Sequence, residues 1–187
     1  MTMTSFQSSD PFKEYRAVLI KVAEFSERIF AAHQDEITCH KGCSQCCVDG
    51  LSVLPIEAQY IQAGLQANPT ISAQKKTTAH CVFLDSQGAC QIYEYRPLVC
   101  RTHGLPLHWG AKEKPSPSST LRILDDDIVT CELNFTTRNK IEKDKALDEI
   151  TLQKLLYVVN VRFCEQNEEK RPNRRIPLVE LVPGKKS

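Results

Sequence analysis

Apolar residues recur at helical spacing in two long segments of the chain. The first segment contains Phe12, Tyr15, Val18, Leu19, Val22, Phe25, Ile29 and Phe30. Asp10 and Pro11 precede it, and this pair is typical of a helix start because Asp can accept hydrogen bonds from free N–H groups and Pro fits the first turn. The pattern predicts an amphipathic helix that ends near His33.

The second periodic segment covers residues 147–166. Its predicted apolar face consists of Leu152, Leu155, Leu156, Val159 and Phe163. Cys164 lies in the same segment, and we expect it to be a small core residue because a free cysteine in an apolar helix packs like a hydrophobe. A shorter helix is predicted from Pro55 to about Gln62, with Gly64 as its stop.

The middle of the chain favours short extended elements. Residues 81–84 and 89–93 predict a small hairpin around a turn at 85–88, and residues 120–124 and 128–133 predict two short strands. Pro97 is expected to open a short turn of helix that carries Cys100, and residues 104–119 have the glycine, proline and serine content of a loop.

These elements together predict a mainly α fold with a small irregular β-hairpin, its helices packed around a cysteine-rich metal-binding centre. The chain has 187 residues, 41% of them hydrophobic and 25% charged, which is the composition of a globular protein. We expect residues 1–169 to form one cysteine-cluster domain, with its core motif region at 35–135. Residues 170–187 are expected to be a basic, proline-broken tail, extended or loosely attached.

Charge and hydropathy limit the cellular compartments and the classes of partner that fit this chain. The formal net charge is +1, so no field over the whole protein favours nucleic acid as a partner. No apolar run approaches the length of a membrane span, and the first ten residues lack the pattern of a signal peptide. We therefore expect a cytoplasmic protein without a membrane partner, in a compartment where thiols stay reduced.

The nine cysteines are the main chemical signal in the chain, and an odd number excludes complete intramolecular pairing. Four of them fall within residues 39–47, and Gly42 allows this segment to curl around an ion. Zinc and iron–sulfur clusters both commonly take four thiolates. The candidate ligands are Cys39, Cys43, Cys46, Cys47, Cys81, Cys90, Cys100 and Cys131.

The number of sites is left open by this pattern. Cys46 and Cys47 are adjacent, so their side chains diverge in most backbone conformations and are not expected to bind one ion together. They could serve different sites, or one of them could be free. Eight cysteines could supply two four-thiolate sites, or one cluster with spare thiols.

Basic side chains near the cysteines are further candidates. Arg96 and Arg101 flank the Pro97 turn and could offset thiolate charge or hydrogen-bond to sulfur at the bound group; the alternative is that they are ordinary surface residues. His103 follows Cys100 in a Cys-x2-His spacing and His40 lies inside the first cysteine cluster, so each is a candidate for a non-thiol ligand.

Two separated motifs carry a resemblance to a known family. They are Cys39-x3-Cys43-x2-Cys46-Cys47 and Cys81-x8-Cys90-Gln-Ile-Tyr93-x2-Arg96-Pro97-x2-Cys100-Arg101. In this order they resemble the YkgJ-type cysteine-cluster family, named for a CxxCxxCC-like motif and described as zinc- or iron-chelating. The first spacer has three residues where the family name has two. The resemblance implies metal binding, and a similar cluster in a flagellin lysine methylase implies that the module can belong to an enzyme.

Three functions are therefore weighed. The first is a metal-binding protein that holds zinc or iron, including an iron–sulfur cluster, through clustered thiolates. The second is an iron–sulfur-dependent modifying enzyme, such as a component that transfers methyl groups to protein lysines. The third is a zinc-ordered module that binds a protein partner or RNA through the basic tail. The sequence leaves open whether the protein is an enzyme.

Overall fold

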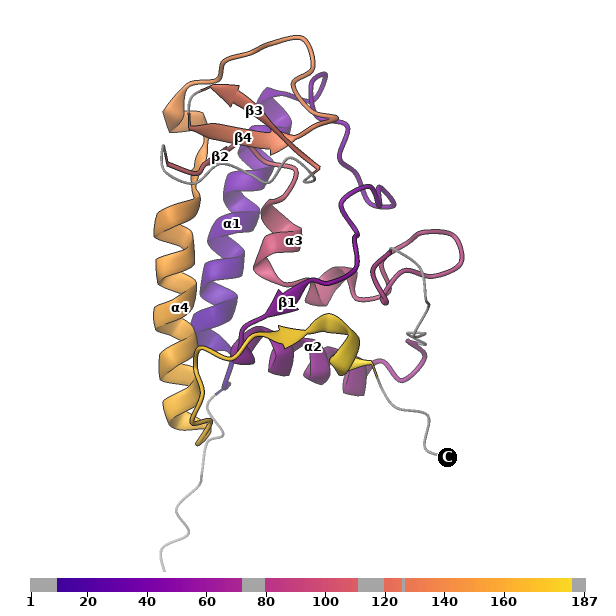
Figure 1. Cartoon of the computed structure of the whole chain (residues 1–187), viewed down its shortest axis with the longest axis vertical. Coiled ribbons are helices and arrows are strands. Elements are labelled where there is room, and N and C mark those ends of the chain that lie inside the picture. Colours follow the sequence, from indigo (N-terminus) through magenta and orange to yellow (C-terminus); the bar gives the residue numbers. More distant parts are fainter. Residues whose placement is uncertain (1–9, 72–79, 111–119, 126, 183–187) are drawn as a thin grey trace, which may run out of the picture.

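Two long helices lie side by side and form the largest packed unit of the fold (Figure 1). The computed structural model describes residues 10–71, 80–110, 120–125 and 127–182. Helix α1 covers Lys13–Ala32 and helix α4 covers Glu149–Gln166, as the apolar periodicity predicts. Their facing sides bury apolar side chains that include Val18, Leu19, Leu156 and Phe163. Burial of this kind is the main stabilising contribution to a helix pair.

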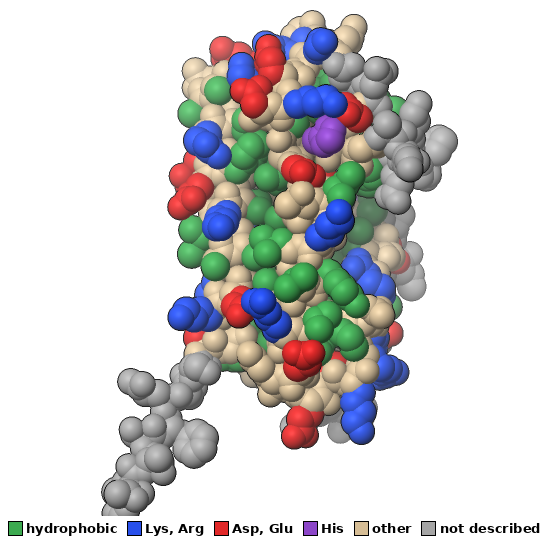
Figure 2. Space-filling view, turned by 90° about the vertical axis from the view of Figure 1, so that its left-hand side faces the viewer, with side chains coloured by type: hydrophobic (Ala, Val, Ile, Leu, Met, Phe, Trp, Pro, Cys, Tyr) green, Lys and Arg blue, Asp and Glu red, His purple; other side chains and the backbone are tan. Residues whose placement is uncertain are grey.

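The apolar faces of the two helices differ in part from the prediction. Cys164 is buried in the core, as expected, but Leu155 is 40% exposed and Phe30 is 36% exposed. Ile150, Tyr157 and Val158 are also exposed on α4, and Figure 2 shows apolar side chains along this side of the molecule. Because α4 carries apolar residues on more than one side, periodicity alone assigned Leu155 to the core wrongly.

Helix α2 extends further than predicted. It covers Pro55–Ala67 and passes through Gly64, the expected stop. The ring of Tyr95 packs directly on this glycine: a Cβ atom at position 64 would lie 2.3 Å from a ring carbon. Gly64 therefore serves close packing rather than helix termination, and the helix ends before Asn68, whose backbone N–H donates to the Gly64 carbonyl at 3.1 Å.

The β-structure consists of two small sheets. One sheet has the order β3-β4-β2-β5, formed by Leu121–Asp125, Ile128–Cys131, Leu107–His108 and Leu147–Asp148. Its pairs are antiparallel except for β2 and β5. The two strands expected around residues 120–133 are thus present as β3 and β4. The expected hairpin at 81–93 is reduced to a single antiparallel bridge between Leu84 and Cys90, because the chain turns into a 3-10 helix at Tyr93–Tyr95.

The second sheet attaches the end of the chain to the rest of the fold. Strand β1 at Ser52–Val53 pairs antiparallel with β6 at Ile176–Pro177. A 3-10 helix follows at Leu178–Leu181, and both of its terminal leucines are buried. The segment expected to be extended or loose is therefore docked onto the fold, through β6 and this 3-10 helix. The basic residues 185 and 186, and most of the predicted 104–119 loop, lie outside the described residues.

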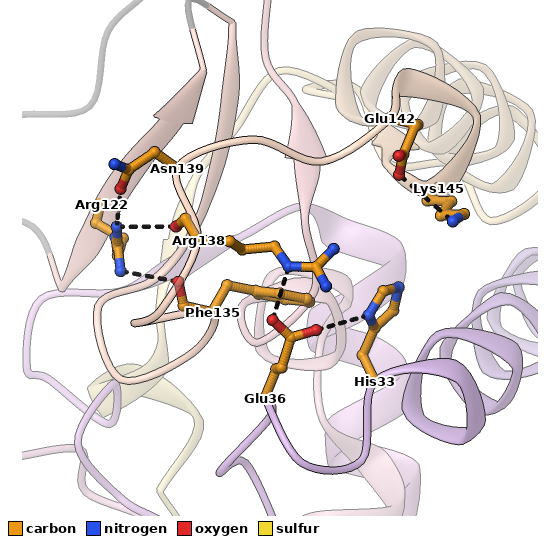
Figure 3. A network of polar contacts seen from close by, with 8 residues as sticks. All are labelled: His33, Glu36, Arg122, Phe135, Arg138, Asn139, Glu142 and Lys145. Carbon is orange, nitrogen blue, oxygen red and sulfur yellow. Dashed lines mark hydrogen bonds and ion pairs between the residues drawn. The ribbon is translucent and has the colours of Figure 1, made fainter.

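A polar network holds the chain where it leaves α1 (Figure 3). Glu36 contacts His33 at 3.0 Å and Arg138 at 2.7 Å, and its backbone carbonyl accepts from the N–H of Phe135 at 2.8 Å. Arg122 on β3 donates to the carbonyl of Phe135 at 3.1 Å. The network joins the end of α1 to the segment after β4, so it fixes the base of the loop that carries the first cysteines.

The described elements make the protein mainly α with small antiparallel and mixed sheets. A fourth helix, α3, is short and covers Leu98–Thr102. No helix among residues 10–71, 80–110, 120–125 and 127–182 is long and apolar enough to span a bilayer.

Candidate metal centre

Six of the eight candidate cysteines line one hollow of about 200 Å³. They are Cys43, Cys46, Cys47, Cys81, Cys90 and Cys100, and we call this space the cysteine hollow. They come from two segments, the loop after α1 and the segment that runs from residue 81 to α3. The backbone N–H of Cys81 donates to the carbonyl of Cys47 at 2.9 Å. This hydrogen bond joins the two sequence motifs directly.

The first segment curls through two consecutive turns. The backbone N–H of Cys43 donates to the carbonyl of His40 at 3.1 Å, and that of Cys47 donates to Ser44 at 2.9 Å. Gly42 between them has a φ of 105°, a conformation that residues with a side chain rarely adopt. The glycine expected to permit a tight loop therefore performs this role.

A buried carboxylate places the second segment. Glu57, 3% exposed on α2, accepts the backbone N–H of Leu98 at 2.9 Å and that of Leu54 at 3.1 Å. It therefore joins the first turn of α2 to the first turn of α3, which carries Cys100. Burial raises the pKa of this carboxyl above its usual range, and the two N–H donors oppose that shift. The sequence analysis missed Glu57, although a glutamate at the third position of a helix that begins with Pro55 is a known capping signal.

Burial and the charges of neighbouring thiols raise the pKa values of several cysteines in the hollow. Burial raises the pKa of Cys100 to about 12, and the neighbouring Cys81, Cys46 and Cys90 add to the shift. The pKa values of Cys81 and Cys90 are also raised, mainly by burial. These mutual effects place the four sulfur atoms in one electrostatic group, since a thiolate on any of them disfavours ionisation of the others.

The adjacent cysteines Cys46 and Cys47 have opposite tendencies. The thiol of Cys47 donates a hydrogen bond to Cys46, which lowers the pKa of Cys46 to about 7 and raises that of Cys47. Both side chains line the hollow, in spite of the divergence expected for neighbouring residues. Cys46 is therefore the thiol of this group that ionises most readily.

Arg96 and Arg101 occupy different environments. The Arg96 guanidinium lies 3.6 Å from the centre of the Tyr93 ring and donates to the carbonyls of Tyr93 and Cys100. Its positive charge acts to lower the pKa values of the thiols at positions 46, 90 and 100. Arg101 instead donates to the backbone carbonyls of Arg96 and Glu94. The charge of Arg96 thus acts on the thiols, whereas the donors of Arg101 bind the backbone of the turn; the charge-compensating role of both arginines stays a prediction.

Cys39 and Cys131 form a second thiol pair next to the hollow: the charge of Cys131 acts to raise the pKa of Cys46, and that of Cys43 acts to raise the pKa of Cys39. Cys39 donates a hydrogen bond to Cys131, which lowers the pKa of Cys131 to about 6 and raises that of Cys39. The amide of Asn134, fully buried, donates to the Cys39 sulfur at 3.3 Å and to the Gly104 carbonyl at 2.7 Å. A Cβ atom at Gly104 would lie 2.7 Å from that sulfur. Cys39 is therefore tightly held, and no sequence pattern pointed to Asn134.

The two candidate histidines lie in different environments. His103 lines the cysteine hollow, with its Nε2 atom 2.8 Å from the Thr120 hydroxyl, and burial lowers its pKa. His40 is exposed, and its Nδ1 atom donates to the Thr38 carbonyl at 2.7 Å. Cys164 is distant from this chemistry, in the core between α1 and α4.

The thiols do not converge in this structure to the geometry of a coordinated ion. Within the part of the chain that the structure describes, no three Cys, His, Asp or Glu side chains form a group that could hold a metal as they stand. The thiols instead hydrogen-bond in pairs, Cys46 with Cys47 and Cys39 with Cys131. The donor set nevertheless fits zinc or iron, because both prefer soft thiolates and six sulfur-bearing side chains surround one space.

One family model matches part of the chain. Residues 38–117 match the family model CxxCxxCC, described as "Putative zinc- or iron-chelating domain". No curated protein and no solved structure matches the chain significantly. The matched segment contains both cysteine motifs, and Cys131 lies beyond it.

Proposed function

We propose that this protein binds zinc or iron through thiolates of the cysteine hollow, because residues 38–117 match the model of a zinc- or iron-chelating domain. The observation that carries the proposal is the gathering of six cysteines from two separated motifs around one space. Chance burial of thiols would not bring together every cysteine of both motifs except Cys39.

We assign the first-choice ligands to Cys46, Cys81, Cys90 and Cys100. The charges of Cys46, Cys81 and Cys90 act within this group and on Cys100, and they act on Cys47 as well. Cys47 is placed second because its thiol donates to Cys46. Four thiolates around a divalent ion carry a net negative charge. Arg96, whose guanidinium acts on three of the four, would offset that charge and orient the Cys100 turn.

The remaining thiols receive different roles. Cys43 and Cys47 line the same hollow and are the alternative ligands if one of the four is not used. Cys39 and Cys131 are paired with each other and held by Asn134, so we assign them a structural role outside the first metal site. Replacement of Cys39 by alanine should therefore leave the metal content unchanged.

An iron–sulfur cluster is the second candidate. One mononuclear ion takes four ligands, and the hollow offers six thiols in addition to His103. A cluster takes four protein thiolates, as zinc does, so the hollow has enough thiols for either group. Arg96 would offset the charge of a cluster in the same way.

The test is anaerobic purification followed by elemental analysis, acid-labile sulfide assay and a visible spectrum on one sample. Stoichiometric zinc in a colourless protein supports the mononuclear site, and iron with labile sulfide and visible absorption supports the cluster. Cys100→Ala and Cys90→Ala should each lose metal or lower its affinity by at least about tenfold, because each removes a direct ligand.

Cys164→Ala is the matched control, since Cys164 is a buried thiol outside the hollow. It should keep the full metal content. The proposal fails if the anaerobic protein carries neither metal, or if Cys100→Ala and Cys164→Ala retain equal amounts.

A further inference from the structure

A second cavity, of about 260 Å³, lies against the cysteine hollow. The two spaces share Cys43, Cys46 and Cys100 among their lining residues. The second cavity, which we call the α1 cavity, is closed on its other side by helix α1. The volume is near the lower end of ligand pockets, which start at about 300 Å³, so it suits a molecule of few heavy atoms.

Arg101 supplies a fixed cation to the wall of the α1 cavity. Its guanidinium is held by the backbone carbonyls of Arg96 and Glu94, and the side chain is half-buried. Within the described ranges it forms no ion pair with a carboxylate. The charge of Arg96 acts on the thiols, whereas that of Arg101 acts on Tyr15. Arg101 is thus a preorganised cation without an assigned counterion in the described part of the fold.

Glu27 supplies an anion to the same cavity from α1. It is exposed, and among the residues whose placement is described it too lacks an ion pair. Apolar side chains of α1, including Val22 and the part-exposed Phe30, also line the space. One cavity therefore presents two arginines, a carboxylate and an apolar wall. Arg96 stacks on the Tyr93 ring, whereas Arg101 and Glu27 form no ion pair with each other.

We propose that the α1 cavity binds a small zwitterion of the amino-acid class. Its carboxylate would accept hydrogen bonds from Arg101, its ammonium group would face Glu27, and its apolar body would contact Val22 and Phe30. Arginine recognises carboxylates through its planar set of donors, and charge-assisted hydrogen bonds are stronger than neutral ones. The inference goes beyond metal binding and does not require the metal to be bound.

Three probes of matched shape test the charge requirement. L-leucine carries both charges, 4-methylpentanoate lacks the ammonium group, and 3-methylbutylamine lacks the carboxylate. Each is titrated into the full-length protein and followed by chemical-shift changes in two-dimensional NMR. Leucine should perturb signals of α1 and α3 and saturate, and each truncated probe should bind about tenfold more weakly or worse, because each loses one charged contact.

Variants connect this binding to the two charges. Arg101→Gln should weaken leucine binding by about tenfold or more. Since Arg101 also holds the turn before α3, Glu27→Gln is the second variant: Glu27 is exposed on α1, so its replacement should not disturb folding. Glu24→Gln is the matched control, because Glu24 is exposed on the same helix and is not a lining residue of the cavity.

The outcomes separate this inference from the metal proposal. Saturable leucine binding that is weakened by Glu27→Gln, and unchanged by Glu24→Gln, supports the zwitterion site whatever the metal content. The inference is overturned if leucine binds no better than its two truncated analogues, if it does not bind, or if Glu27→Gln and Glu24→Gln bind it equally. Elemental analysis of the same samples reports on the cysteine hollow independently.

Discussion

The paired helices and the cysteine hollow are stabilised in different ways. Between α1 and α4 the side chains interdigitate in an apolar core, with Tyr15 fully buried and Leu156 2% exposed. Around the hollow the thiols are only half-buried, and the regular structure consists of an isolated bridge, a 3-10 turn and the five-residue α3. The helices can rely on apolar burial, whereas the hollow depends on a few polar anchors and, in our proposal, on the metal.

Metal removal should produce the largest difference in local stability between the paired helices and the cysteine hollow. A chelator strong enough to take the ion should greatly increase amide hydrogen exchange in residues 39–50 and 80–104 and leave α1 and α4 protected. Structural zinc contributes about 10–16 kcal/mol in zinc-finger peptides, so the loss at the hollow should be the largest effect of all. Exchange followed by mass spectrometry measures it, with metal added back as the control.

An equal increase in exchange across both regions would show that the helices also depend on the metal. No increase in either region would show that the hollow is fixed by protein contacts alone. Either result would remove the distinction drawn here.

Leu156→Ala should destabilise the paired helices and leave the cysteine hollow unchanged. Leu156 is 2% exposed in the α1–α4 core, so its truncation should lower the free energy of unfolding by about 2–5 kcal/mol. Metal content per folded chain should not change. Urea denaturation and elemental analysis measure the two quantities, and Leu155→Ala, at a 40% exposed position of the same helix, is the matched control with a much smaller effect.

Gly64→Ala should disturb the contact between α2 and the hollow. A Cβ atom there would collide with the Tyr95 ring, in the 3-10 turn between Cys90 and Cys100. Overpacking of this kind costs about 1–3 kcal/mol, and we expect weaker metal binding together with reduced stability. Ala63→Gly, at the neighbouring position in α2, tests helix propensity without the collision and should leave metal affinity unchanged. Unaltered affinity in Gly64→Ala would mean that Tyr95 does not position the ligands.

Glu57→Gln should change the pH dependence of stability and also lower its level, because one of the two backbone N–H groups that the carboxylate accepts would face the NH2 group of glutamine. Burial raises the pKa of Glu57 in the folded protein, so the folded state holds this proton more tightly than the unfolded state. Stability from this group is therefore fully present below the unfolded pKa, near 4.5, and is lost as pH rises through the folded value. The slope of unfolding free energy against pH should be less negative in Glu57→Gln, by at most about 1.4 kcal/mol per pH unit.

Denaturant titrations of both proteins between about pH 5 and about pH 7.5 measure this difference. Most proteins reach their highest stability in this pH range. Glu24→Gln, at an exposed position, is the control and should keep the wild-type slope. Identical slopes for wild type and Glu57→Gln would show that the buried carboxyl does not titrate in this window.

Local pattern in the sequence was sufficient for the long helices. The period of apolar residues predicted α1 and α4, and the spacing of Cys43, Cys46, Cys90 and Cys100 predicted a binding region before any contact was known. These signals are local or depend on residue chemistry, so one chain reveals them. The burial of Cys164 follows in the same way from its position within an apolar helix.

Contacts between distant residues decided the rest. Gly64 is a packing site because Tyr95 lies against it, β1 pairs with β6 across more than a hundred residues, and Asn134 holds Cys39. The division of the cysteines into a hollow of six and a second pair next to it also arises from tertiary structure. A sequence pattern states which residue types are present and at what spacing, but hydrogen bonds and desolvation depend on which side chains the folded chain brings together.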